Sequence, residues 1–179
     1  MLKAFAVLMF LGVVAFPAVP AAGPSSDGAV ITSTAVKEAM KNAKPNPGAV
    51  PGTYDVTLRS LDTGNAYVGV AVIRRVQAED KDALVHANVT EIYQMTEGSG
   101  TIELGGTLVA GKPFGGGSGP SAIGPSTRGT GIQGGHSRKV GVGDVVVIPA
   151  GTPHRFSAID GPITYLCFRV DPSKVTPLK

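Results

Sequence analysis

The sequence predicts an all-β protein, an antiparallel barrel or sandwich that follows one short helix. Several short runs are rich in β-branched residues or alternate between apolar and polar side chains, and glycine and proline separate these runs. Only one stretch has helical periodicity of useful length. Short strands separated by turn residues are typical of architectures that pack two sheets or close one sheet into a barrel.

The first 21 residues are predicted to be a signal peptide. Lys3 provides a positive start, residues 4–16 form an apolar run too short to span a bilayer comfortably, and prolines and small residues follow. We expect cleavage after Ala21. The chain is therefore predicted to be secreted or periplasmic, without a stable membrane anchor.

The remaining chain is expected to form one domain with an N-terminal extension. Residues 22–53 make up the extension, and a helix from Thr32 to Lys44 is predicted within it, capped by Ser33 or Thr34. Prolines directly after Lys44 end this helix. Residues 54–179 are predicted to form the β domain.

The predicted strands are short and are punctuated by glycine and proline. In chain order they are 54–59, 66–73, 84–87, 91–95 in a hairpin with 101–104, 145–148 and 163–170. Residues 105–135 are rich in glycine and are predicted to form a long loop. Either a lid at the mouth of the barrel or a floppy insertion fits this composition.

The charged residues and the cysteine exclude several classes of protein. The formal net charge is only +3, without a cluster of Lys and Arg, so nothing indicates a nucleic-acid partner. The basic pairs Arg74-Arg75 and Arg138-Lys139 are interpreted as solvated strand residues. Cys167 is the single cysteine, which excludes an internal disulfide. Its apolar surroundings predict a buried structural thiol.

The first of two histidine motifs begins at His86. Glu91 follows five residues later, and Gly98 follows seven residues after that. Because side chains alternate along a strand, Tyr93 and Met95 are expected on the same face as Glu91.

The second motif ends at His154. It begins with Gly143, continues through five residues to Pro149, and passes Gly151 before it reaches the histidine. Pro149 and Gly151 are expected to shape a bend that directs His154 inward.

These two motifs, in this order, resemble those of the cupin family, and the resemblance covers roughly residues 66–170. It implies a cupin-type antiparallel jelly-roll β-barrel with a site at one mouth. It also implies that His86, Glu91 and His154 bind a divalent transition metal. Imidazole and carboxylate are suitable ligands for Fe, Mn, Ni, Cu or Zn.

Leu84 departs from the cupin pattern, because that position normally carries a second histidine two residues before His86. Three protein ligands then remain, in a two-histidine, one-carboxylate set with open positions. Alternatively the site has decayed, and His86 and Glu91 are hydrogen-bonded structural residues. His136 either replaces the missing ligand from the glycine-rich loop or lies on the surface.

The leading functional prediction is an exported metal-binding cupin. It would act as a metal-dependent oxygenase, isomerase or lyase on a small organic molecule, with Tyr93 as the candidate for proton transfer. The alternative is a non-catalytic cupin that binds a sugar or metabolite in the barrel. The sequence does not decide whether the chain is an enzyme. A homodimer is expected, because cupins often pair through strand edges.

Overall fold

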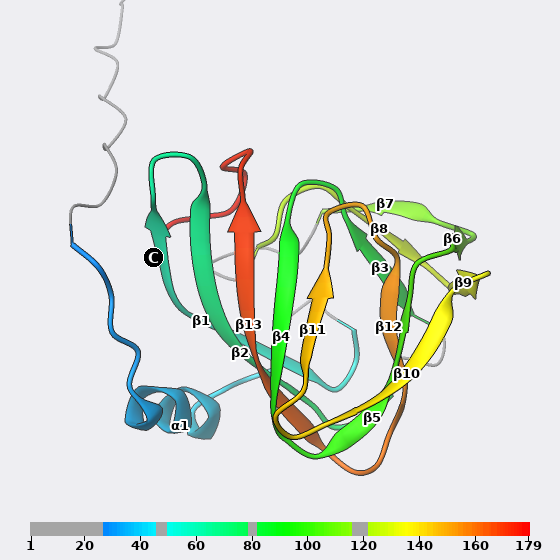
Figure 1. Ribbon diagram of the computed structural model, residues 1–179, viewed down its shortest axis with the longest axis horizontal. Coiled ribbons are helices and arrows are strands. Elements are labelled where there is room, and N and C mark those ends of the chain that lie inside the picture. The colour runs from blue at the N-terminus through cyan, green and yellow to red at the C-terminus, as the bar shows by residue number, and fades with distance from the viewer. Residues whose placement is uncertain (1–26, 46–49, 79–81, 116–121) are drawn as a thin grey trace, which may run out of the picture.

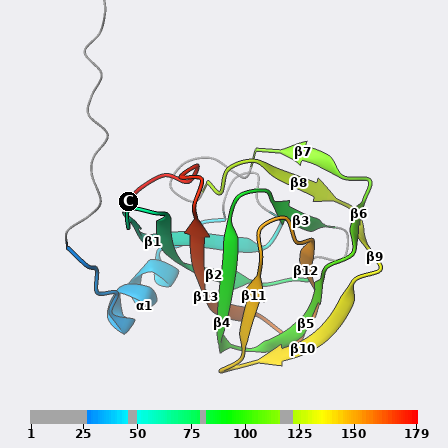
Figure 2. The same cartoon turned by 45° about the horizontal axis from the view of Figure 1, so that its top comes forward.

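The computed structural model describes residues 27–45, 50–78, 82–115 and 122–179. Two antiparallel sheets face each other and enclose the core, with one helix outside them (Figures 1 and 2). The prediction of an all-β, cupin-type jelly-roll barrel with a short N-terminal helix is confirmed. The predicted signal peptide, residues 1–21, lies outside the described residues. Among those described, no helix combines the length and the apolar character needed to cross a bilayer.

The helix α1 spans Ser33–Lys41, three residues shorter than predicted at its C-terminal end. Thr32, rather than Ser33 or Thr34, is the N-cap, and its side chain accepts a hydrogen bond from the Ala35 amide at 3.1 Å. None of the helical residues is buried, and α1 lies mainly against β1 and β2. The helix is therefore an external attachment to the barrel.

The first sheet has five strands in the order β1-β2-β13-β4-β11. Every neighbouring pair in it is antiparallel. Its strands are β1 (Thr53–Asp62), β2 (Tyr67–Arg75), β13 (Ile163–Asp171), β4 (Thr90–Glu97) and β11 (Val145–Ile148).

The second sheet has six strands in the order β10-β5-β12-β3-β8-β7, and a separate ribbon pairs β6 with β9. The second sheet consists of β10 (His136–Gly141), β5 (Ser99–Leu104), β12 (His154–Ile159), β3 (Ala83–His86), β8 (Ser126–Gly129) and β7 (Lys112–Phe114). The ribbon consists of β6 (Thr107–Val109) and β9 (Gly131–Gln133).

The predicted hairpin of 91–95 with 101–104 is wrong. The strand β4 pairs with β11 and β13, whereas β5 pairs with β10 and β12 in the opposite sheet. The chain therefore turns a corner between the sheets at Gly98. This residue has φ +73°, and a Cβ there would lie 2.5 Å from the carbonyl oxygen of Pro162, so only glycine fits without rearrangement.

The glycine-rich segment 105–135, predicted to be a long loop, contains short strands in its described part. Its described part contains β6, β7, β8 and β9, and β8 extends the second sheet beside β3. Phe114 and Ile123 from this segment line the cavity described below. The segment thus forms part of the wall of the barrel.

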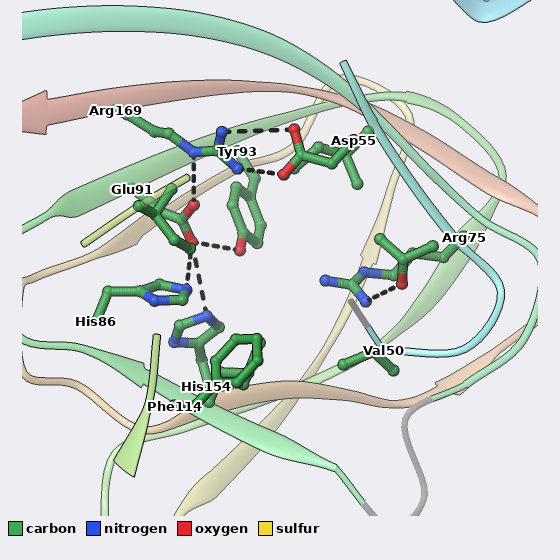
Figure 3. Close-up of a pocket in the computed structure, with 13 residues that line it drawn as sticks. Val50, Asp55, Arg75, His86, Glu91, Tyr93, Phe114, His154 and Arg169 are labelled. Carbon is green, nitrogen blue, oxygen red and sulfur yellow. Dashed lines mark hydrogen bonds and ion pairs between the residues drawn. The ribbon is translucent and has the colours of Figure 1, made fainter. Parts of the chain in front are cut away.

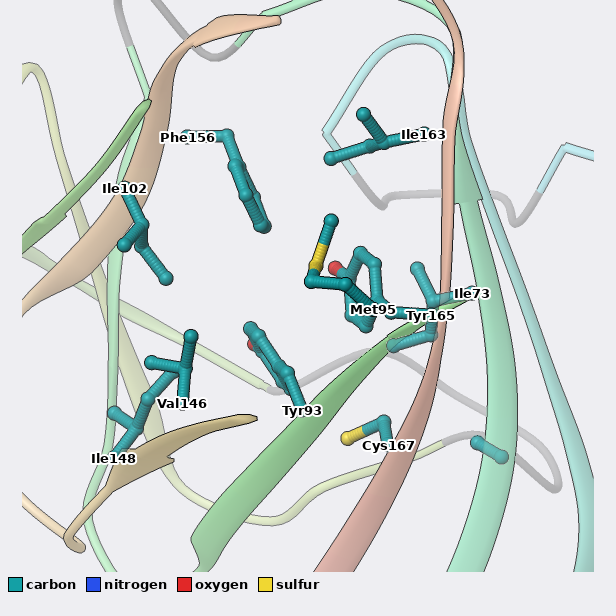
Figure 4. Close-up of a cluster of buried hydrophobic side chains, with 11 residues drawn as sticks. Ile73, Tyr93, Met95, Ile102, Val146, Ile148, Phe156, Ile163, Tyr165 and Cys167 are labelled. Carbon is teal, nitrogen blue, oxygen red and sulfur yellow. The ribbon is translucent and has the colours of Figure 1, made fainter. Parts of the chain in front are cut away.

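The core lies between the sheets and is built from alternating residues of the facing strands (Figure 4). On β4, Glu91, Tyr93 and Met95 are all buried, which confirms the predicted alternation. The rings of Tyr93 and Tyr165 lie 4.5 Å apart between centroids. The cluster comprises Ala71, Ile73, Tyr93, Met95, Ile102, Val146, Ile148, Phe156, Ile163, Tyr165 and Cys167.

Replacing Val146 with alanine is expected to lower the free energy of unfolding by about 2 kcal/mol, because a buried side chain loses carbon atoms and leaves a cavity. The matched control is Val147→Ala on the next residue. Val146 is 6% exposed and Val147 is 57% exposed, so the control should change stability by less than about 0.5 kcal/mol. Urea unfolding measures both. Equal losses would contradict the assigned alternation on β11.

Candidate metal centre

The structure brings together the three predicted ligands, which come from both sheets (Figure 3). Glu91 lies on β4 of the first sheet, and His86 on β3 and His154 on β12 belong to the second. One potential ligand atom from each lies within 4.8 Å of the other two. The exposed fractions of His86, Glu91 and His154 are 3%, 2% and 5%.

The second motif positions His154 through a backbone contact with the first. The bend contains Gly151 at φ +80°, and the amide of Gly151 donates to the carbonyl of His86 at 2.9 Å. His154 then pairs with Leu84 across β12 and β3. Since Leu84 and His86 point to the same face of β3, the two imidazoles become neighbours, with ring centroids 5.2 Å apart.

The outer hydrogen bonds of both histidines place a proton on Nδ1 of each ring. Nδ1 of His154 lies 3.0 Å from the carbonyl oxygen of Thr152, which only accepts, so this nitrogen carries the proton. Nδ1 of His86 lies 2.8 Å from the Ser126 hydroxyl, which donates its own hydrogen to the Gly124 carbonyl. His86 therefore donates through Nδ1 as well. Each Nε2 is left with a lone pair.

Both lone pairs face one carboxylate oxygen. Oε2 of Glu91 lies 3.8 Å from Nε2 of His86 and 3.6 Å from Nε2 of His154. A metal ion with bonds of about 2.1 Å holds adjacent ligand atoms roughly 3 to 3.5 Å apart. Three electron-rich atoms at nearly that spacing fit a cation between them.

The carboxylate of Glu91 is oriented by three other side chains. Its Oε1 accepts from Nε of Arg169 at 3.1 Å and from the Cys167 thiol at 3.4 Å. Its Oε2 accepts from the Tyr93 hydroxyl at 2.7 Å. Arg169 is itself held by Asp55, with Nη2 to Oδ2 at 2.5 Å. Because Oε1 is occupied in this way, Oε2 is the atom presented to the histidines.

Burial and charge keep His86 and Glu91 in the forms that bind metals. Burial lowers the pKa of His86 to about 3, so the ring is neutral at pH 7. Burial opposes ionisation of Glu91, but the positive charge of Arg169 and the hydrogen bond from Tyr93 favour the carboxylate and hold its pKa below the usual value. Burial, together with the charge of Glu91, raises the pKa of Tyr93 well above its usual value, so its hydroxyl keeps its proton.

The structure also places the other residues singled out in the sequence. Leu84 lines the same cavity as the three ligands, so the missing ligand position carries an apolar side chain that faces the site. His136 is exposed on β10 and is not part of the cluster, which confirms the surface interpretation. Cys167 is a buried free thiol, as predicted.

Two buried arginines, Arg75 and Arg169, were not predicted as residues of the site, and the prediction that Arg75 is solvated is wrong. The sequence predicts that both Arg74 and Arg75 are solvated, but Arg75 is only 5% exposed and lines the cavity. The interpretation holds for Arg138 and Lys139, which are exposed. Arg169 was not singled out. The available signal was strand alternation, which places Arg75 with Ile73 and Arg169 with Cys167 and Tyr165.

Comparison with known proteins gives structural matches only; no family model and no curated protein sequence matches the chain. A recombinant oxalate oxidase in complex with glycolate is 16% identical, with 74% of this chain and 57% of that one covered, at a TM-score of 0.44. KdgF from Halomonas sp. is 13% identical, with coverages of 69% and 83% and a TM-score of 0.45.

A third match is the formate complex of oxalate decarboxylase from Lactobacillus farciminis. It is 13% identical, with 74% of this chain and 32% of that one covered, at a TM-score of 0.46. The chain thus spans between about a third and just over half of the length of the two oxalate enzymes.

The antiparallel two-sheet barrel and the places of the two motifs within it agree with the cupin-type jelly-roll fold that the sequence predicted. The first motif supplies His86 and Glu91 from opposite sheets, and the second supplies His154 beside them. Within this fold, the chain has a buried cluster of two histidines and one carboxylate, with leucine at the position of the fourth ligand.

The stability of the metal-free protein is expected to fall as the pH drops from about 6.5 towards 5. The unfolded chain binds a proton on His86 near its ordinary pKa, whereas the folded chain does so only near pH 3, so protons favour unfolding in this window. The slope from this single proton approaches about 1.4 kcal/mol per pH unit.

Urea unfolding of chelator-treated protein at pH 5.0, 6.0 and 7.0 measures this slope. His86→Gln should reduce it, because glutamine does not titrate. His136→Gln, on the exposed face of β10, is the control and should leave it unchanged. The same slope in wild type and His86→Gln would refute the assignment of a buried neutral His86.

Proposed function

We propose that this chain binds one divalent transition-metal ion on His86, Glu91 and His154. The observation that carries the proposal is the pair of Nε2 lone pairs directed at Oε2 of Glu91, at 3.8 and 3.6 Å. Without a cation, these three atoms would repel one another in a buried place, where water screens charge weakly. With a cation, each of them gains a bond.

We further propose that the site acts on a small organic molecule, as an oxygenase, isomerase or lyase. Three protein ligands leave coordination positions open, and a metal there would act as a Lewis acid or bind oxygen. The cavity beside the ligands measures about 60 Å³, and its lining combines apolar side chains with polar and charged ones. The apolar side chains lower the local dielectric constant and so strengthen electrostatic interactions in the site.

The surrounding side chains have separate parts in this proposal. Arg169 holds Oε1 of Glu91 and so favours binding of the ion through Oε2 alone, which keeps a position open for a ligand. Tyr93 donates its hydrogen to Oε2 and keeps its proton at neutral pH. Its role in proton transfer stays a prediction; as a protonated phenol it would serve as a donor rather than as a base.

A non-catalytic binding protein is the second candidate, and Leu84 is the observation that favours it. This residue places an apolar side chain where a fourth ligand would stand, and Phe114 and Ile123 add to the same wall. Such a cavity holds a small metabolite without any need for turnover. A metal-free chain that still binds a small molecule would support this candidate.

Export and homodimer formation stay predictions. The predicted cleavage after Ala21 is tested by N-terminal sequencing of the protein released from cells.

Pairing of two chains would be supported by the edge strand β11, where Val145 and Val147 are 59% and 57% exposed. Sedimentation equilibrium of the purified chain tests it.

Protein purified without a histidine tag is expected to hold about one transition-metal ion per chain, and His154→Ala should reduce this to near zero. Removing one of three ligands leaves two, which is too few to hold the ion in competition with water. The matched control is His136→Ala, because His136 is exposed and outside the cluster. Elemental analysis of the purified proteins measures the content.

A folded wild-type chain that takes up none of Fe, Mn, Ni, Cu or Zn from excess salt would contradict the proposed metal site. Uptake that is equal in wild type and His154→Ala would assign the metal to another place on the chain.

Replacing Leu84 with histidine is expected to tighten metal binding by about tenfold or more, equivalent to roughly 1.4 kcal/mol. Leu84 lies on the same face of β3 as His86 and lines the cavity, so the new imidazole would supply a fourth protein ligand. Competition with a chromophoric chelator measures the affinity. Unchanged affinity in a folded Leu84→His protein would mean that position 84 is not directed at the ion.

A further inference from the structure

The segment that follows β13, residues 172–179, joins the two sheets at one end of the barrel; we call it the clasp. It turns back from the end of β13 towards β1, the edge strand of the first sheet (Figures 1 and 2). The clasp contains neither helix nor strand. Contacts with other parts of the chain therefore decide where it lies.

The clasp is anchored to the first sheet at two places. The amide and the hydroxyl of Thr176 donate to Oδ2 of the buried Asp171 at 2.7 and 2.8 Å. Ser60 on β1 donates from its hydroxyl to the carbonyl of Pro177 at 2.9 Å and from its amide to the carbonyl of Lys179 at 3.1 Å. The position of the clasp is therefore set by the first sheet.

Two residues of the clasp contact turns that flank strands of the second sheet. The hydroxyl of Ser173 accepts from the side-chain amide of Asn88 at 3.1 Å, in the turn after β3. Val175 lies against Gly124, in the turn before β8. A Cβ on Gly124 would lie 2.5 Å from Cγ2 of Val175, so this close approach requires glycine. The clasp therefore bridges the two sheets.

Both of these turns adjoin the metal-ligand candidate on β3. The turn after β3 begins directly after His86. In the other turn, the carbonyl of Gly124 accepts from the Ser126 hydroxyl at 3.0 Å, and that hydroxyl lies 2.8 Å from Nδ1 of His86. A chain of direct contacts thus runs from Val175 through Gly124 and Ser126 to the imidazole.

The geometry of the metal centre depends on this chain of contacts. The Ser126 hydroxyl accepts the Nδ1 proton of His86 while it donates its own hydrogen to Gly124, so a shift of Gly124 weakens its hold on the ring. Hydrogen-bond partners of metal-binding histidines fix the orientation of the ring, and their loss typically weakens metal binding by about tenfold to a hundredfold.

We propose that the clasp positions His86 for the metal ion, with Val175 as a positioning residue that acts through Gly124 and Ser126. This inference rests on the proposed metal site, to which it adds a support far along the chain from the ligands. The first sheet carries Glu91 and holds the clasp, and the clasp holds the turn that orients His86. The ligands of the two sheets are thereby kept in register.

The first test measures the affinity of the full chain for Co²⁺ by competition with a chromophoric chelator. Val175→Ala is expected to weaken binding by about threefold to tenfold, and Ser126→Ala by about tenfold to a hundredfold. The matched control is Leu178→Ala. Leu178 is 45% exposed, close to the 39% of Val175, but its neighbours in sequence bond to β1. Its affinity should be unchanged. Undiminished affinity in a folded Val175→Ala protein overturns the proposal.

A double-mutant cycle separates positioning from a general loss of packing. If Val175 acts through Ser126, Val175→Ala has little further effect on Co²⁺ affinity once Ser126→Ala is present, whereas independent effects multiply. The visible absorption of bound cobalt should also change in Val175→Ala and stay as in wild type in Leu178→Ala, because it reports the ligand geometry. Losses that multiply, or an unchanged spectrum in Val175→Ala, overturn the route through Ser126.

A metal-free measurement separates this inference from the proposed metal site. A wild-type chain that takes up no cobalt contradicts the metal site, and amide hydrogen exchange then tests the clasp. The amide of Ala87 donates to the carbonyl of Pro125 at 2.9 Å and so joins the two turns. Val175→Ala should speed its exchange by about threefold or more, because local opening becomes easier. The amide of Met95, bonded to the carbonyl of Asp144 at 3.0 Å, is the control. An unchanged rate at Ala87, or equal acceleration at both amides, overturns the clasp.

Discussion

The rest of the site depends on the buried carboxylate of Glu91. An ionised group that is 2% exposed is costly unless other groups compensate its charge and satisfy its oxygens. Arg169 and Tyr93 do both from the same sheet, and they approach different oxygens of the carboxylate. The second sheet contributes two imidazole nitrogens to the remaining side of Oε2. The site is therefore complete only when the two sheets close on each other, which couples the folding of the barrel to the assembly of the ligands.

The hydrophobic core and the site are linked by aromatic side chains that belong to both. Tyr93 packs against Tyr165 through its ring and reaches Glu91 through its hydroxyl. Tyr165 in turn accepts from Arg75 on the far side of the cavity. The polar groups of the site are thus positioned by aromatic side chains that the hydrophobic core already immobilises. A site supported in this way keeps its geometry without a ligand, which is the condition for a preorganised centre.

Local pattern predicted β1 to β5, β11 and β13, and it singled out the three residues of the cluster, because each motif lies within one short stretch of chain. It did not predict β10 or β12, although β12 begins at His154. Nonlocal pairing was not predictable in the same way. The corner at Gly98 resembled a hairpin, since adjacency in sequence does not tell whether two strands join the same sheet. Segment 105–135 has the composition of a loop, yet its backbone pairs with distant strands. Arg75 was missed because it was considered with Arg74, although neighbouring residues on a strand face opposite sides. The contact of Arg169 with Asp55 joins residues 114 positions apart and has no local signal.

Leu84 left two interpretations open in the sequence, an open three-ligand site and a decayed one. In a decayed site, replacing the buried ionic groups with apolar residues of similar volume would often keep or raise the stability of the protein. The chain instead retains the Arg169 contacts to Glu91 and Asp55, and both histidines have outer hydrogen bonds that direct Nε2 inward. These contacts orient the three side chains towards one point. Residues that only fill the core would not need this common orientation. Under the proposed metal site, Leu84 therefore leaves a coordination position open beside an apolar wall, which favours the open three-ligand interpretation over the decayed one.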